Sequence, residues 1–265
     1  MFFPPVQRKK ASPARRAVLY WKQGVRPAGA THTAYGGNAM SKYVFDDFYA
    51  DYDSWYQTPM GAFVDRVETD CALGLLEPAA GQSVLDAGCG TGNFSLKLAE
   101  MGCRVTAVDV AEKMMDQARQ KAVRAGADIR FLREDMAELP FGDGSFDRVL
   151  TMAAFEFLPD PARAVRELLR VLRPGGVLVI GTIEKGGPWA GLYESDAMAG
   201  TAYERASFLT GESIAAMAPE AFEAMERCLF VAPGAPEGDF TPEGEAAAKA
   251  AGARGGFVCL RFRKK

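Results

Sequence analysis

Short runs of strand-forming residues alternate with stretches of helical periodicity through the middle of this 265-residue chain. The strand-like runs are Ser83–Asp86, Arg104–Val108, Ile129–Leu132, Phe146–Thr151 and Val177–Ile183. Such alternation predicts an α/β fold in which a mostly parallel sheet carries helices on both faces. Because sheets of this kind bind ligands at the carboxyl ends of their strands, the residues that follow these runs are the first candidates for a functional site.

The flanking segments extend this pattern. A helix is predicted from about Met60 to Leu76, and another begins at Asp160, which is placed to cap it ahead of Pro161. Two more strands are predicted at Glu223–Val231 and Phe257–Arg263, with no helical crossover of the usual pattern between them. The absence of a crossover favours an antiparallel pair at the edge of the sheet.

Charge is distributed unevenly along the chain. Residues 1–39 contain seven basic side chains and no acidic one, whereas residues 40–265 contain 24 basic and 34 acidic side chains. The resulting net charge of −10 argues against nucleic acid as a partner of the second part. Residues 1–39 are either a transit peptide, which their prolines and weak periodicity disfavour, or a disordered leader, or sequence upstream of a true start at Met40. We therefore expect one domain over 40–265.

Residue counts exclude several kinds of chemistry. His32 is the only histidine, which argues against Ser-His-Asp hydrolysis and against zinc sites built from several histidines. The five cysteines are too scattered for a CxxC pair, so no metal site is predicted, and their odd number indicates free thiols in a reducing compartment. No apolar run approaches the roughly 18 residues of a membrane span. The sequence thus predicts a cytoplasmic protein without a membrane span.

The strand-like run that contains Asp86 leads into a glycine-rich turn, Gly88-Cys89-Gly90-Thr91-Gly92, which opens a helix. Glycine is needed where a backbone turns tightly or lies close to a ligand, and the start of the helix offers unpaired N–H groups. The spacing is GxGxG, with an acid two residues before the first glycine, and differs from the GxGxxG of dinucleotide-binding enzymes. This spacing points away from a pyrophosphate ligand.

Further carboxylates follow the next two strands. Asp109 comes 17 residues after Gly92, at the position where an acid accepts both ribose hydroxyls in nucleoside-binding sheets. Alone, Asp109 has an alternative role as a helix cap, but its offset from the glycine-rich turn favours the ribose. Asp135 follows the third strand, where a carboxylate can accept from an adenine amine. A solvated acidic turn is the alternative there, and Glu134 is expected to be one.

Four sequence segments, taken together, indicate one protein family more specifically than any of them does alone. VLDAGCGTGNFS, VTAVDVAEKMM, EDMAELPFGDGSFDRVL and VLRPGGVLVIGT span roughly residues 81–183 and resemble the class I S-adenosylmethionine-dependent methyltransferases, specifically their ubiquinone/menaquinone-biosynthesis (UbiE-like) branch. The later segment FLTGESIAAMAPEAFEAMERCLF is similar to the last helix and sixth strand of that group. The resemblance implies a Rossmann-like sheet of seven mostly parallel strands with an antiparallel last strand.

The resemblance also implies S-adenosyl-L-methionine as the cofactor. The residues that it assigns to the cofactor lie at the methionine end (Asp86, Gly88, Gly90, Thr91), around the ribose and adenine (Asp109, Val110, Met114, Asp135, Met136), near the sulfonium (Met152) and over the cofactor (Tyr52 or Tyr56). Tyr52-Asp53 matches a YD element that the first helix of the family usually carries.

Methyl transfer from a sulfonium is an in-line displacement, so an enzyme of this class mainly aligns the acceptor with the methyl carbon and excludes water. A base is needed only where the acceptor must lose a proton. Glu156, which follows the fourth strand, is the acid placed for that catalytic role, and a capping or surface carboxylate is its alternative role. The chain is thus expected to be a methyltransferase that acts on a small molecule.

Aromatic residues are concentrated in two segments that we expect to form the acceptor pocket. Residues 42–56 are dense in Tyr, Phe and Trp, and the insertion 184–209 contains Trp189, Tyr193, Tyr203 and Phe208. They predict a small aromatic cap and a partly apolar acceptor. Packing of the cap against the sheet is the alternative role of each ring.

Three other functions share parts of this pattern. A nicotinamide-dependent oxidoreductase would need GxGxxG, which the glycine-rich turn lacks. An aminopropyl transferase would need several acids near the fourth strand to hold a polyamine, and the sequence offers only Glu156 there. A non-catalytic S-adenosylmethionine-binding protein would keep the nucleoside site and lack a pocket above the sulfonium. The last two are the alternatives to methyl transfer.

Overall fold

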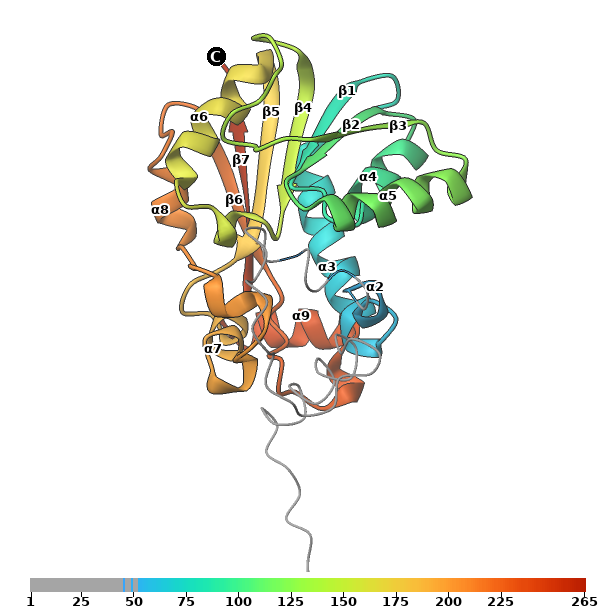
Figure 1. Cartoon of the computed structure of the whole chain (residues 1–265). Helices are drawn as coiled ribbons and strands as arrows, with labels where there is room; N and C mark the ends of the chain where they lie inside the picture. Colours follow the sequence, from blue (N-terminus) through green and yellow to red (C-terminus); the bar gives the residue numbers. More distant parts are fainter. Residues whose placement is uncertain (1–44, 46–48, 50–51) are drawn as a thin grey trace, which may run out of the picture.

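The computed structural model describes residues 45, 49 and 52–265, which include one seven-stranded sheet in the order β3-β2-β1-β4-β5-β7-β6 (Figure 1). The strands are β1 Ser83–Ala87, β2 Arg104–Asp109, β3 Ile129–Arg133, β4 Phe146–Met152, β5 Leu172–Ile183, β6 Phe222–Cys228 and β7 Phe257–Arg263. β1 to β5 pair in parallel, and β7 is antiparallel to both of its neighbours. The predicted seven-stranded sheet with an antiparallel last strand is confirmed.

Helices cover both faces of the sheet. The α-helices of the described residues are α2 Tyr52–Trp55, α3 Pro59–Leu76, α4 Asn93–Glu100, α5 Glu112–Ala125, α6 Pro161–Val171, α7 Pro188–Tyr193, α8 Gly211–Ala215 and α9 Pro242–Ala250. The helices α3, α4 and α5 pack on one face, and α6 and α8 pack on the other. In Figure 1, α2, α7 and α9 lie below the sheet.

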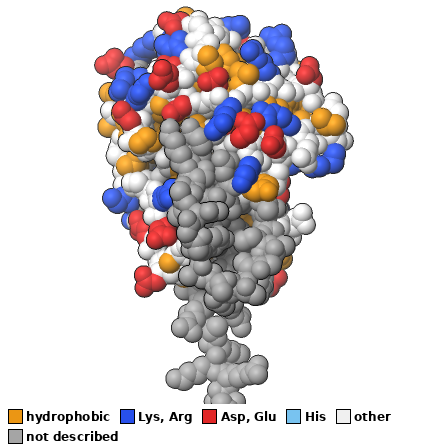
Figure 2. Space-filling model, in the orientation of Figure 1, with side chains coloured by type: hydrophobic (Ala, Val, Ile, Leu, Met, Phe, Trp, Pro, Cys, Tyr) orange, Lys and Arg blue, Asp and Glu red, His pale blue; other side chains and the backbone are white. Residues whose placement is uncertain are grey.

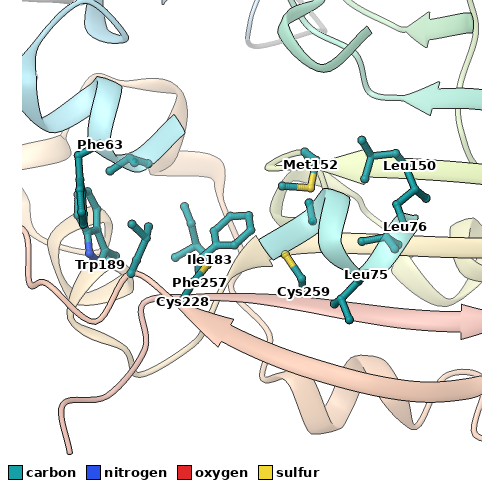
Figure 3. Packing of buried hydrophobic residues seen from close by; sticks show 14 of the residues in the cluster. Phe63, Leu75, Leu76, Leu150, Met152, Ile183, Trp189, Cys228, Phe257 and Cys259 are labelled. Atoms are coloured by element: carbon teal, nitrogen blue, oxygen red, sulfur yellow. The ribbon is translucent and has the colours of Figure 1, made fainter. Parts of the chain in front are cut away.

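The alternation of side chains along the buried strands divides the core into two layers. In β5, Val177 and Val179 belong to the layer beneath α3 and α4, whereas Leu178 and Ile180 belong to the layer beneath α6. All four side chains are fully buried, as expected of a parallel sheet that is covered on both faces. Figure 3 shows part of the first layer, in which the strand residues Leu150, Met152 and Cys259 lie next to Leu75 and Leu76 of α3.

Local signals explain most element boundaries. The predicted cap of α6 is confirmed, because Asp160 Oδ1 accepts a hydrogen bond from the amide of Arg163 at 2.9 Å. The strand predicted to reach residue 231 ends at Cys228, because Leu229 adopts a left-handed φ of 57° that extended backbone does not allow. Apolar periodicity does not predict α9, although Thr241 accepts from the amide of Gly244 at its start and is a recognisable cap.

The exposed charges of the described residues are interspersed. On the face shown in Figure 2, Lys and Arg side chains alternate with Asp and Glu side chains over the upper part. Several such groups are paired, among them Arg170 with Asp143 at 2.7 Å and Arg173 with Asp147 at 2.6 Å. Within the described ranges, none of the helices has both the length and the apolarity that crossing a membrane requires. The leader predicted over 1–39 lies outside these ranges.

We expect Phe257→Ala to lower the free energy of unfolding by about 3–5 kcal/mol, because the change leaves a cavity where a fully buried ring begins β7. Denaturant unfolding followed by circular dichroism measures the loss. Val123→Ala is the control, since this side chain is 81% exposed on α5, and it should change stability by less than about 0.5 kcal/mol. Equal stability of the two variants would contradict the assignment of Phe257 to the core.

Candidate functional site

A cavity that is partly open to solvent lies where β1, β2 and β4 end. All residues that the sequence analysis assigned to the cofactor lie on the cavity wall: Tyr52, Tyr56, Asp86, Gly88, Gly90, Thr91, Asp109, Val110, Met114, Asp135, Met136 and Met152. The fold therefore brings together residues that are up to 100 positions apart in the chain, from Tyr52 to Met152.

The glycine-rich turn after β1 has left-handed backbone at each of its glycines. The angle φ is 77° at Gly88, 54° at Gly90 and 79° at Gly92. A Cβ on Gly88 would lie 2.7 Å from the Cβ of Ala154, and a Cβ on Gly92 would lie 2.9 Å from the Cβ of Ala118. Gly88 and Gly92 thus serve the packing of the turn. Around Gly90 there is more space, so its backbone is accessible to a ligand in the cavity.

Main-chain groups fix the position of Asp109 at the end of β2. Its Oδ2 accepts a hydrogen bond from the amide of Gly90 at 2.8 Å, and its Oδ1 accepts from the amide of Ala111 at 2.8 Å. The carboxylate therefore joins β2 to the glycine-rich turn and to the residue before α5. An ionised carboxylate offers about four acceptor positions, so these two bonds are compatible with further bonds from ribose hydroxyls.

Asp86 is the most buried acid on the cavity wall, with a side chain that is 1% exposed. Its Oδ2 accepts from Ser95 Oγ at 2.5 Å. Burial raises the pKa of Asp86 to about 7; the hydrogen bond from Ser95 opposes this shift, and the nearby Asp109 carboxylate adds to it. A cationic group placed next to Asp86 would favour its ionised form.

Asp53 connects α2 to the glycine-rich turn and to α5. Its Oδ1 accepts from Thr91 Oγ1 at 2.7 Å, and its Oδ2 accepts from Lys121 Nζ at 2.9 Å. Lys121 Nζ also donates to Thr91 Oγ1 at 3.2 Å and to Asn93 Oδ1. We call Asp53, Thr91, Asn93 and Lys121 the α2 latch. It holds Tyr52 over the cavity, and the sequence analysis missed Lys121 because this residue is 68 positions from its partner.

Aromatic rings form a continuous series from α2 to the insertion 184–209. Phe45 contacts Tyr52 and Phe157, with ring centroids 6.2 and 4.8 Å apart. Phe157 contacts Tyr203 at 5.7 Å, and Tyr203 stacks on Tyr193 at 4.1 Å. Phe45, Tyr52 and Phe157 line the cavity, whereas the rings of the insertion support them from behind. Phe157 therefore connects the two segments that were predicted to form the acceptor pocket.

Two glutamates lie near this aromatic side. Glu156, in the short 3-10 helix η2 (Phe155–Phe157), is 2% exposed and lies behind the cavity wall. Its Oε2 accepts from Thr182 Oγ1 at 3.0 Å, its buried Oε1 has no hydrogen-bond partner among the described residues, and burial raises its pKa to about 7. Glu68 of α3 lies on the wall itself. The sequence analysis missed Glu68, since no motif in the helix marks it.

The α2 latch generates a first prediction. Asp53→Asn and Lys121→Met should each destabilise the fold, and a double-mutant cycle should give a coupling energy of about 1 kcal/mol, because the two side chains are only 32% and 17% exposed. Denaturant unfolding of the four proteins measures it. The exposed pair of Arg119 and Asp116 on α5 is the control and should give a smaller coupling. Zero coupling between Asp53 and Lys121 would contradict the latch.

The buried position of Asp86 generates a prediction for pH. Because its pKa rises from 3.8 to about 7 on folding, the folded state binds more protons, and stability should fall as pH rises from about 4 to 7. The Asp86→Asn variant lacks this titration. Its free energy of unfolding minus that of wild type should therefore rise by on the order of 2 kcal/mol between about pH 5.5 and 8.5. Denaturant titrations of the ligand-free proteins measure it. A difference independent of pH would refute the shift.

Comparisons with known proteins bear on this geometry. Residues 85–180 match the model of a methyltransferase domain. Demethylmenaquinone methyltransferase of Clavibacter sepedonicus is 36% identical over 138 residues, which cover 52% of this chain and 55% of the relative. Ubiquinone biosynthesis O-methyltransferase of Xanthomonas axonopodis pv. citri (strain 306) is 34% identical over 146 residues, or 53% of this chain and 60% of the relative. The chain thus spans about half the length of the curated relatives it matches.

Solved structures extend the similarity to most of the chain. A methyltransferase from Thermotoga maritima, described as a "possible histamine N-methyltransferase", superposes with a TM-score of 0.64 and 25% identity, covering 84% of this chain and 99% of that one. The [4+2]-cyclase SpnF has the same fold, with a TM-score of 0.58 and 23% identity over 95% and 93% of the two chains. Residues 85–180 therefore match a methyltransferase domain, and the chain is similar to methyltransferases of ubiquinone and menaquinone biosynthesis, the group that its motifs indicated.

Proposed function

We propose that this protein transfers a methyl group from S-adenosyl-L-methionine to a small-molecule acceptor. The observation that carries the proposal is the cavity at the ends of β1, β2 and β4, which collects the glycine-rich turn, Asp109 and Met152 on one wall. The named relatives support it, because they are methyltransferases that match this chain over the segment that builds the wall.

The residues of the wall fit this cofactor. When bound, S-adenosylmethionine supplies an activated methyl group on a positively charged sulfur. Asp109 and Asp135 place carboxyl groups on the described wall, and a cation bound there would favour the ionised form of Asp86. Gly90 leaves room for a ligand beside the main chain, and Val110, Met114 and Met136 offer apolar surface for a nucleobase. We assign Asp109 to the ribose and Asp86 to the methionine end.

The chain then has to orient an acceptor and exclude water. Tyr52 and Tyr56, whose hydroxyl oxygens are 3.3 Å apart, close the cavity on the α2 side. Aromatic faces and the Met152 thioether stabilise positive charge in the reacting region without a formal counter-ion. Glu156 stays a candidate proton acceptor: its pKa of about 7 suits the role, whereas its place behind the wall gives it no contact with an acceptor.

The proposal also covers the acceptor's polarity, the domain bounds, the partners and the location of the protein. The aromatic wall supports a partly apolar acceptor, and we propose a single domain over 40–265 with 184–209 as its cap and no nucleic-acid partner. The five cysteines are free thiols, which supports a reducing, cytoplasmic location.

An aminopropyl transferase is the second candidate, and one observation favours it. Glu68 adds to Glu156 a second acid near the aromatic side of the cavity, and a polyamine site needs such acids. The relatives favour methyl transfer. Incubation of the protein with either S-adenosylmethionine or its decarboxylated form, followed by mass spectrometry of the products, separates the two reactions.

We expect Asp109→Ala to weaken S-adenosylmethionine binding by about 2–4 kcal/mol, or roughly 30- to 1,000-fold in Kd, because charge-assisted hydrogen bonds to the ribose are lost. Calorimetry measures the affinity. Asp116→Ala, an exposed change of the same charge on α5, is the control. Asp109→Asn keeps an oxygen for a main-chain amide and should bind with intermediate affinity. Unchanged affinity in folded Asp109→Ala would remove the ribose assignment.

A further inference from the structure

The cavity wall extends beyond the residues assigned to the cofactor. This extension contains two aromatic rings, Phe45 and Phe157, and the carboxylate of Glu68, next to Tyr52 and Tyr56. No Lys or Arg side chain belongs to the described part of the wall. The extension is thus aromatic with one carboxyl group, and it offers an anionic acceptor no cationic side chain as a partner.

One cation, Lys97 of α4, acts electrostatically on Glu68 and lowers its pKa. Its Nζ donates to Asp65 Oδ1 at 2.6 Å and to Thr69 Oγ1 at 2.8 Å, on either side of Glu68 in α3. The hydrogen bonds of this ammonium thus go to the neighbours of Glu68 in the helix. The described part of the chain offers the Glu68 carboxylate no hydrogen bond or ion pair, so a positively charged ligand is what the wall can accommodate there.

A second buried carboxyl group, that of Glu156, interacts with Glu68. Glu156 is 2% exposed, and its Oε1 is buried without a hydrogen-bond partner in the described residues. Burial raises the pKa of Glu68 well above its ordinary value, and the repulsion of Glu156 raises it further. The titratable groups that interact with Glu68 come from its own helix (Asp65, Cys71), from α4 (Lys97), from η2 (Glu156), from β6 and β7 (Cys228, Cys259) and from three tyrosines (Tyr52, Tyr56, Tyr193). Only one of them is a cation.

We propose that the methyl acceptor is a small aromatic or aliphatic amine, that it binds as an ammonium ion between the rings of this extension, and that Glu68 accepts its proton. The inference rests on the proposed methyl transfer. An ammonium ion is attracted both by a carboxylate and by the faces of aromatic rings. It carries no lone pair, so it has to lose a proton before it can attack a methyl group.

The reaction balances with the groups on the wall. One N–H bond of the ammonium breaks, and its proton goes to a carboxylate oxygen of Glu68, which leaves the lone pair on nitrogen. This pair forms the new N–C bond while the C–S bond of the sulfonium breaks, and the sulfur keeps the bonding electrons as a neutral thioether. The product is a methylated ammonium ion, and the proton on Glu68 returns to solvent.

The experiment uses the full chain with the demethylated cofactor bound. Calorimetry compares 2-phenylethylamine with 2-phenylethanol, its neutral analogue. The amine should bind at least about tenfold more tightly, and Glu68→Gln should abolish this preference, because a charge-assisted hydrogen bond is lost. Glu100→Gln, an exposed change at the end of α4, is the control and should keep the preference. With the methylated cofactor, Glu68→Gln should also lower kcat/KM for amines by about a hundredfold or more.

Three results would overturn the inference. The first is the lack of a preference for the amine, including no binding of either probe. The second is a preference that survives Glu68→Gln. The third is a loss of S-adenosylmethionine affinity in Glu68→Gln beyond about threefold, because Glu68 would then serve the ammonium of the cofactor itself. If wild-type protein fails to bind S-adenosylmethionine at all, the proposed function fails instead, which separates the two tests.

Discussion

The site depends on a carboxylate that main-chain amides hold in place. Asp109 accepts from Gly90 and Ala111, so one side chain sets the position of the glycine-rich turn, the end of β2 and the start of α5. The left-handed backbone of Gly90 is what allows its amide to reach this carboxylate. Asp109, which we assign to the ribose, is thus already oriented before a ligand binds. Such preorganisation lowers the free-energy cost of ordering the site on binding.

The acids around the cavity link stability to function. Asp86 and Glu68 both have a raised pKa because their surroundings disfavour a carboxylate ion. Without a ligand this arrangement weakens the fold at neutral pH, whereas a cation in the cavity would relieve it. Binding sites commonly carry such local destabilisation, because the groups that recognise a charged ligand are poorly matched in its absence.

The sequence predicted the sheet and most of the cavity for a simple reason. Strand ends, the glycine-rich turn and Asp109 are local motifs, and parallel pairing places consecutive strand ends side by side. Features that depend on contacts between distant segments were not predictable: Lys121 meets Asp53 across 68 positions, and Glu68 faces the cavity only because α3 crosses beside it. The early end of β6 follows from one left-handed residue, Leu229, whose side chain gives no hint of that conformation.

The α2 latch makes the position of α2 more sensitive to ionic strength than the sheet is. An ion pair and a hydroxyl hydrogen bond between partly exposed side chains hold α2 beside the cavity. The strands that end at the cavity are instead buried on both faces of the sheet. Ionic strength weakens the first kind of contact and leaves the second almost untouched. Added salt should therefore loosen α2 before it affects the sheet.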